Sequence, residues 1–417
     1  MRVNIVRSRV FSPAISTTAK MATTKIVEKM LFAIVITVVA ASLATQSHAQ
    51  FTPLATGTAT LDGAGSCPQS SGWLAGGTCK HYTISNCPYA QPLGVTINYV
   101  PASGTSKGTI VFFGGGPGTS ANTDSGQEAT FATAYLLAGF SSVQTAWDSD
   151  WENTDVPGDI GLPYVASILA AACRPATLMS AINGSSLYHP VGAMCAQGAS
   201  AGGGGVAYAL EWYGAKLYLN NVELTSGPTF SSILQGCRVP NFGAVTICGP
   251  NQYGCNNEYG NTQSWMNAPQ YIDEALYLGS MQAWTSDDTC QNVPVGQQTS
   301  TLSNQAWLNM SIVNPAGGDF TFPTTSMAGW VCAGNRNNYQ SGTCNVGSPS
   351  CPNNSGSQGA LFHQQFSSGN RPKPHYAFTG ISLCNGEEGV AGSQAVTPNG
   401  TLGVTAIQTD MEAHCTK

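Results

Sequence analysis

Ser200 is the residue best placed to act as a nucleophile. It lies at the centre of the run GASAG at 198–202. An apolar stretch at 191–196 precedes this run and predicts a short buried strand, while the glycine-led segment 203–215 predicts a helix. A serine on a tight turn between a strand and a helix has an accessible hydroxyl, and the N–H groups of the helix start can stabilise an oxyanion. The pattern therefore predicts acyl-transfer chemistry at Ser200.

A second glycine-rich element lies upstream and fits the same chemistry. Residues 107–119 read KGTIVFFGGGPGT, in which a β-branched and aromatic strand runs into a loop at 114–118. Backbone N–H groups of such a loop can bind a developing oxyanion. We expect the donors to be the N–H of Ala201 together with that of Gly115 or Gly116.

The two elements together resemble the nucleophile elbow and oxyanion loop of the α/β-hydrolase superfamily, in its secreted esterase and lipase branch. The loop is also similar to the H-G-G-P-G loop of proline-iminopeptidase-like hydrolases, although glycine replaces the leading histidine. The resemblance implies an α/β fold: a mostly parallel eight-strand sheet, helices on both faces and a disulfide-tied lid inserted after the sixth strand. It also implies catalysis through an acyl-enzyme on Ser200.

The order of elements along the chain agrees with this fold class. Strands are predicted at 80–85, 95–100, 109–113, 142–147, 191–196, 221–225, 327–332 and 375–382. Helices are predicted at 127–138, 166–182, 203–215, 358–367 and 402–414. The first two strands alternate as an antiparallel pair, and the later alternation of strand and helix favours a parallel sheet. Residues 50–80 are predicted to be rich in loops. We expect a hydrolase domain to span 50–417, with 237–320 as its inserted lid.

The base and the acid of a catalytic triad are harder to assign. The resemblance places the base after the last strand, where the loop holds Glu387 and Glu388 but no histidine, and the loop after strand 327–332 holds no carboxylate. Three alternatives remain open. Glu387 or Glu388 acts on Ser200 directly; His414 is the base, with Asp410 or a glutamate orienting it; or His363 or His375 reaches the site in a different strand register.

The N-terminal segment has the pattern of a secretory signal. Three lysines precede an apolar run at 30–44, and Ser47-His48-Ala49 forms a small-x-small cleavage site, so we expect cleavage after Ala49. Six of the 15 Lys and Arg and one of the 21 Asp and Glu lie before that point, which leaves nine basic and 20 acidic residues. Such a mature chain repels phosphate backbones, so nucleic acid is excluded as a partner. No segment after the signal predicts a membrane span.

All 14 cysteines follow the signal, which favours disulfides in an exported chain. We expect Cys173 to pair with Cys195 and brace the elbow, and Cys332 to pair with Cys384 at the ends of the last two strands. No C-x-x-C pair occurs and the six histidines are scattered, so the spacing predicts no metal site.

The leading hypothesis is a secreted or periplasmic serine esterase that needs no cofactor and acts as a monomer on a neutral ester, either a small molecule or a polymer. The first alternative is a catalytically impaired binding protein on a hydrolase scaffold, which the missing histidine favours. A secreted serine peptidase is the second alternative. Labelling of Ser200 by a fluorophosphonate separates an enzyme from a scaffold.

Overall fold

The computed structural model describes residues 52–65, 67, 72–116, 118–121, 126–152, 168–188, 192–231, 311–313, 318–332, 359, 362–363, 365–366, 371–384 and 389–417. Residues Pro53–Lys417 form one compact unit, to which Met1–Thr52 do not belong. Within the described residues, no helix is both long and apolar enough to cross a membrane.

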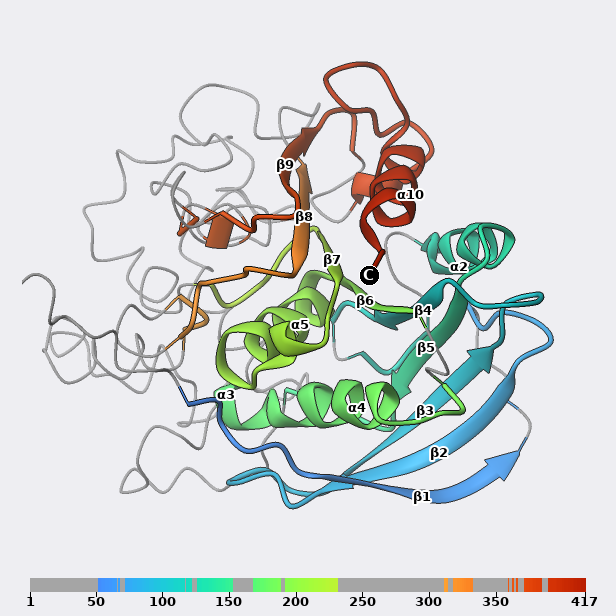
Figure 1. Cartoon of the computed structure of the whole chain (residues 1–417), viewed down its shortest axis with the longest axis vertical. Helices are drawn as coiled ribbons and strands as arrows, with labels where there is room; N and C mark the ends of the chain where they lie inside the picture. Colours follow the sequence, from blue (N-terminus) through green and yellow to red (C-terminus); the bar gives the residue numbers. More distant parts are fainter. Residues whose placement is uncertain are drawn as a thin grey trace, which may run out of the picture. The chain divides into compact units, whose positions relative to one another are not determined.

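The described residues form a nine-stranded sheet in the order β1-β2-β3-β5-β4-β6-β7-β8-β9 (Figure 1). The strands are β1 (Thr58–Gly65), β2 (Thr78–Ser85), β3 (Leu93–Val100), β4 (Gly108–Phe113), β5 (Ser141–Trp147), β6 (Ala193–Ala199), β7 (Asn221–Thr225), β8 (Ser326–Cys332) and β9 (Tyr376–Ile381). The pairs β1–β2, β2–β3 and β3–β5 are antiparallel, and all later pairs are parallel. The predicted α/β class and the predicted antiparallel pair are therefore confirmed.

Helices cover both faces of the sheet. On one face α2 (Glu128–Leu137) packs against α10 (Gly403–His414), and on the other α4 (Cys173–Asn183) packs against α5 (Ser200–Trp212), with α3 (Ile168–Ala171) next to α4 (Figure 1). A buried apolar core lies under α2 and α10. Its largest members include Phe112, Phe131 and Tyr135, and it reaches Ile407 and Met411 on α10.

The strand order reverses around β4. The chain leaves β4 through α2 to reach β5 on one side, and returns through α3 and α4 to β6 on the other side. In open α/β sheets ligands bind outside the carboxyl ends of the strands at such a switch point. We call the edge where the parallel strands end the carboxyl edge, and the opposite edge the amino edge. Ser200 follows β6 and Gly114 follows β4, so both lie at the switch point on the carboxyl edge.

The strand β1 was missed by sequence analysis, which predicted loop over 50–80. Its sequence TATLDGAG has neither an apolar alternation nor a run of β-branched residues, and nearly all of it is exposed. It pairs only with β2 and is the outermost strand on that side of the sheet. An edge strand with little to bury carries no strong signal in sequence, so its ladder hydrogen bonds define it.

Four disulfides lie within the described residues: Cys67–Cys79, Cys87–Cys173, Cys195–Cys415 and Cys332–Cys384. The prediction for Cys332–Cys384 is confirmed, with the two Cα atoms 6.0 Å apart. The prediction of Cys173–Cys195 is wrong. The Cys195 side chain lies in the core under α10, whereas Cys173 starts α4 on the other face of the sheet. Cys195 therefore ties β6 to the residue that follows α10.

The lid expected at 237–320 lies outside the described residues except for 311–313 and 318–320. These two segments pack on the far end of α5. Ile312 donates its backbone N–H to the carbonyl of Phe230, and Asp319 donates its backbone N–H to that of Glu211. Asp319 also forms an ion pair with the buried Lys216. The expected function of a lid over the active site stays a prediction.

Candidate active site

The turn at Ser200 has the geometry that the GASAG run predicts. Strand β6 ends at Ala199 in extended conformation, with φ −101° and ψ 136°, and α5 begins at the next residue. Ser200 itself has φ +48°. A residue other than glycine rarely occupies the left-handed region, and where one does the conformation is strained and is often found at functional sites. The predicted strained strand-to-helix turn is therefore confirmed, and only 3% of Ser200 is exposed.

The glycines of the run allow the backbone to pass very close to β4. A Cβ atom on Gly202 would lie 2.2 Å from the carbonyl oxygen of Phe113, and one on Gly198 would lie 2.8 Å from the carbonyl oxygen of Gly202. Such separations are far below van der Waals contact, so no side chain fits at either position. The small residues are thus required to hold α5 against the end of β4.

The glycine loop after β4 lies directly against Ser200. A Cβ atom on Gly115 would lie 3.3 Å from Cβ of Ser200. The loop turns through Gly116 and Gly118, with φ +56° and +69°. Gly118 donates its N–H to the carbonyl of Gly115 at 3.2 Å, and its own carbonyl accepts from Trp147 N at 2.9 Å. The loop is therefore closed by its own turn and fastened to the end of β5.

The first amides of α5 lie next to Ser200 in the chain, because the helix begins at that residue. Ala201 is in the first turn of a thirteen-residue helix, whose leading N–H groups have no carbonyl partner within the helix. Ala201 follows Ser200 directly and Gly115 lies against its Cβ, so these two predicted donor positions are both next to this serine, at the positive end of a helix dipole. The arrangement can stabilise negative charge that develops on an oxygen next to Ser200 Oγ.

Sequence analysis missed a second strained turn beside Ser200. Strand β7 is followed by Ser226 at φ +52° and, four residues later, by Phe230 at φ +62°. A Cβ atom on Gly227 would lie only 2.9 Å from the carbonyl oxygen of Ser200. The turn thus packs against the elbow from the β7 side. The glycine and proline at 227–228 were the only signal of a turn, and they carried no sign of its proximity to Ser200.

The loop after β5 lies near the same edge and buries an acid. Trp151 packs against the loop and α5, because Cβ atoms on Gly118 and Gly205 would lie 3.0 Å and 3.4 Å from its ring. The next residue, Glu152, is buried, and burial raises its pKa well above the ordinary value, with the neighbouring Asp150 adding to the effect. The sequence of the loop after β5, DSDWENTD, is acidic and aromatic but gave no indication that Glu152 would be buried.

Glu387 and Glu388 lie outside the described residues, but both ends of their loop are described. Cys384 follows β9 and is joined to Cys332 at the end of β8. A Cβ atom on Gly389 would lie 3.5 Å from the backbone of Cys384. Cys384 and Gly389, the residues on either side of 385–388, therefore lie close together at the carboxyl edge, the edge that carries Ser200.

His414 is at the amino edge, so the prediction that it is the base for Ser200 is wrong. It precedes Cys415, which is bonded to Cys195. Ser200 lies five residues further along β6 from Cys195, which is roughly 16 Å at the rise of a strand. Asp410, the predicted orienting residue, lies beside His414 in the same part of α10, with Nδ1 and Oδ2 3.4 Å apart. A general base must lie within hydrogen-bond reach of its proton, directly or through one water.

The two remaining histidines considered as bases have other partners. His363 is buried between Gly329 and Phe378, and its Nδ1 lies 3.0 Å from the hydroxyl of Tyr376. Burial lowers its pKa to about 3, so its ring is neutral. His375 immediately precedes β9 at the amino edge and contacts Asp410. Neither contact places a histidine at Ser200.

The structure combines three features: a mostly parallel sheet, a strained turn at Ser200 and a glycine loop that lies against that serine. The chain has the α/β-hydrolase fold. This assignment rests on the strand order, on Ser200 at the strand-to-helix turn and on Gly115 beside it. The sheet carries nine strands rather than the predicted eight, because β1 extends its antiparallel end.

No protein family model matches the chain, and no curated protein matches its sequence. Three solved structures of similar fold are esterases. Acetyl xylan esterase 1 from Thermoanaerobacterium sp. JW/SL YS485 is 12% identical over 79% of this chain and 83% of that chain, with a TM-score of 0.40. A bacterial heroin esterase is 13% identical over 82% and 83%, with a TM-score of 0.40. Brefeldin A esterase, a bacterial homologue of human hormone sensitive lipase, is 12% identical over 84% and 79%, with a TM-score of 0.41.

Proposed function

We propose that this protein is a secreted serine hydrolase that cleaves neutral carboxylic esters through an acyl-enzyme on Ser200. The observation that carries the proposal is the strained turn at Ser200, with a glycine loop against it at the switch point of the sheet. Strain in a serine backbone persists only where the surrounding structure imposes it, and such strain is often found at functional sites. The signal pattern at 1–49 supports export.

The reaction follows from these positions. Ser200 Oγ attacks the ester carbonyl while its proton passes to the base, and the carbonyl oxygen becomes an oxyanion. That oxyanion accepts hydrogen bonds from the N–H of Ala201 and from Gly115 or Gly116. Collapse expels the alcohol, which takes up the proton, and leaves the acyl group on Ser200. Water then attacks the acyl-enzyme with the same base, releases the acid and restores the serine.

Glu387 or Glu388 is the base in this proposal. Their loop starts at the Cys332–Cys384 bridge on the carboxyl edge, whereas His375 and His414 lie at the amino edge and His363 is enclosed by aromatic rings. A carboxylate is a weak base at its ordinary pKa, so it needs a dry site that raises that pKa. The substrate is neutral because the mature chain is acidic and would repel an anionic ester.

A second candidate function is a binding protein that keeps the elbow for packing alone. The observation that favours it is the placement of His81, His363, His375 and His414, the histidines of the described residues, none of which has contacts at the elbow. In that case the serine would not be activated, because the free hydroxyl is a poor nucleophile.

A fluorophosphonate probe separates the two functions. An activated serine forms one phosphonyl ester per chain, and peptide mapping would place it on Ser200. As the probe labels the full mature chain, its rate of p-nitrophenyl ester hydrolysis should fall in proportion to the labelled fraction. A folded chain that neither labels nor hydrolyses a panel of neutral esters would leave the binding protein as the better account.

A further inference from the structure

The amino edge of the sheet carries a second cluster of chemically competent side chains. His375, Asp410 and His414 each offer a ligand atom, and these atoms all lie within 4.8 Å of one another. His375 Nε2 is 3.0 Å from Asp410 Oδ1, and His414 Nδ1 is 3.4 Å from Asp410 Oδ2. His375 immediately precedes β9, and His414 precedes Cys415, which is bonded to Cys195 five residues before Ser200, so these histidines have no part in the proposed ester chemistry.

We propose that His375, Asp410 and His414 bind a divalent transition-metal ion, with Zn²⁺ as the best fit. Two imidazoles and one carboxylate are a donor set that zinc accepts. Around a tetrahedral zinc ion with bonds near 2.1 Å, neighbouring ligand atoms lie about 3.4 Å apart. The separation of 3.0 Å between His375 Nε2 and Asp410 Oδ1 is therefore close to that of an assembled site.

The surroundings of Asp410 resemble the support that a metal ligand needs. The carboxyl of Glu223 on β7 is hydrogen-bonded to Asp410. Glu223 is itself held by Asn221 Nδ2 at 3.0 Å and by the indole N–H of Trp330. Hydrogen bonds from behind a ligating carboxylate fix its orientation and raise its affinity for the ion.

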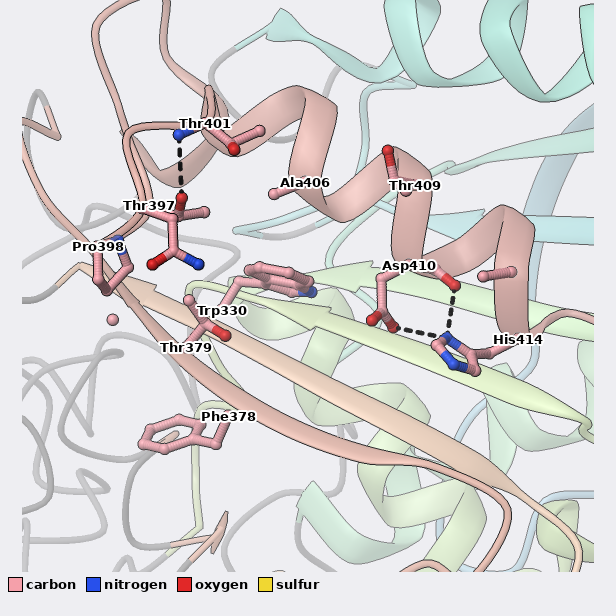
Figure 2. Close-up of a pocket in the computed structure, with 13 residues that line it drawn as sticks. Trp330, Phe378, Thr379, Thr397, Pro398, Thr401, Ala406, Thr409, Asp410 and His414 are labelled. Atoms are coloured by element: carbon pink, nitrogen blue, oxygen red, sulfur yellow. Dashed lines mark hydrogen bonds and ion pairs between the residues drawn. The ribbon is translucent and has the colours of Figure 1, made fainter.

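The cluster has space for the ion to enter and for a water to complete its coordination. A pocket of about 560 Å³ along α10 is lined by Trp330, Asp410 and His414 (Figure 2). A second pocket of about 720 Å³ reaches His414 from the side of Pro374 and Thr416. The side chains of His375, Asp410 and His414 are 24%, 14% and 29% exposed. A site with three protein ligands and an open fourth position fits these observations.

Two adjustments are needed when the ion binds. The rings of His375 and His414 lie parallel, with centroids 3.5 Å apart, so one ring must turn to aim its lone pair at a shared ion. The last torsion of a histidine side chain is broad, which permits that rotation. The hydrogen bond from His414 Nδ1 to the carbonyl of Asp410 can persist if Nε2 is the ligating atom. The bound ion would join the start of β9 to the last turn of α10.

Zinc alone is the probe for the test. The mature chain, incubated with ZnCl₂ and freed of excess metal on a desalting column, should retain one zinc per chain by atomic emission. Replacing zinc with Co²⁺ should give the visible absorption of a tetrahedral ion with nitrogen and oxygen ligands. At a zinc concentration near 100 times the dissociation constant, the melting temperature should rise by a few degrees.

Single substitutions assign the ligands. Asp410→Asn, His375→Gln and His414→Gln should each abolish retention of zinc, and Glu223→Gln should weaken binding about 10-fold to 100-fold. His81→Gln is the matched control, because His81 also contacts two carboxylates, Asp62 and Asp148, but in a different part of the fold. Circular dichroism at low temperature checks that each variant is folded, and His414→Gln at the helix end is the least disruptive.

Two results would overturn the proposal. A wild-type chain that retains no zinc and shows no cobalt spectrum has no site. Zinc that is lost in His81→Gln but kept in the folded His414→Gln variant is bound elsewhere. Neither result bears on Ser200, so the ester hydrolase proposal stands or falls separately.

Discussion

The two edges of the sheet hold their polar groups by different means. At the carboxyl edge the surroundings of Ser200 are mainly backbone, brought close by Gly115, Gly198 and Gly202. At the amino edge the side chains of His375, Asp410 and His414 contact one another directly. The arrangement at Ser200 depends on the absence of Cβ atoms from these glycines. The cluster at the amino edge depends on the nitrogen and oxygen atoms at the ends of its side chains. A substitution that adds one carbon should therefore damage the first, and one that removes a donor should damage the second.

The largest expected effect is on Ser200 itself. Ser200→Ala removes the nucleophile and should lower turnover of a p-nitrophenyl ester by at least about 10³-fold. The melting temperature should change little, because the elbow is held by its neighbours and not by the hydroxyl. A variant that keeps full activity would remove Ser200 from the mechanism and leave the carboxyl edge without a nucleophile.

The next effect tests which glutamate acts as the base for Ser200. Replacing Glu387 and Glu388 singly with Gln should reduce turnover about 10²-fold to 10⁴-fold at one position and little at the other. Each variant is the matched control of its neighbour, since they remove the same group from the same loop. In the wild type, the rate should rise with pH through the pKa of the carboxyl that acts as the base, and the variant that lacks this carboxyl should lose that rise.

A smaller effect is expected from crowding the elbow. Gly202→Ala would place a Cβ atom 2.2 Å from the carbonyl oxygen of Phe113 and 2.5 Å from that of Gly114. Relief of this overlap should lower the free energy of unfolding by about 1 to 3 kcal/mol. It should also displace the glycine loop, and a shift near 1 Å can cost about 10²-fold in turnover.

Gly63→Ala is the control for this crowding. A Cβ atom on Gly63 meets nothing within 4 Å, so the change should alter stability by no more than about 0.5 kcal/mol. Chemical denaturation and ester hydrolysis, measured on both variants, separate the loss of stability from the loss of rate. Equal behaviour of the two variants would show that close backbone approach is not what builds the site.

The same contrast explains what the sequence could predict. The glycines and the serine of GASAG are adjacent in the sequence. The GASAG turn, the glycine loop and the strands around them could therefore be predicted from residues that are close together along the chain. The cluster at the amino edge joins His375 to residues 35 and 39 positions away, and only the packing of α10 on the sheet brings them together. The spacing of histidines therefore predicted no metal site.

The wrong disulfide has a related cause. Cys173 and Cys195 are close in sequence and in consecutive elements, which made them an attractive pair. Which face of β6 the Cys195 side chain occupies depends on the alternation of the strand relative to α4 and α10, and a shift by one residue reverses it. By contrast, Cys332 and Cys384 both lie at the ends of neighbouring strands, where no choice of face is needed.

The smallest effect concerns the buried acid at the carboxyl edge. Burial and Asp150 raise the pKa of Glu152, so the unfolded chain releases this proton at a lower pH than the folded chain. Stability therefore falls as pH rises above the unfolded value of about 4.3, until the folded group has also ionised. Glu152→Gln removes this loss, so the melting temperature of the variant relative to wild type should increase as the pH rises above about 4.3. Glu412→Gln on α10, which changes the same group at a less buried position, is the control. If the difference is constant with pH, or Glu412→Gln shows the same trend, Glu152 is not a buried acid held neutral beside the site.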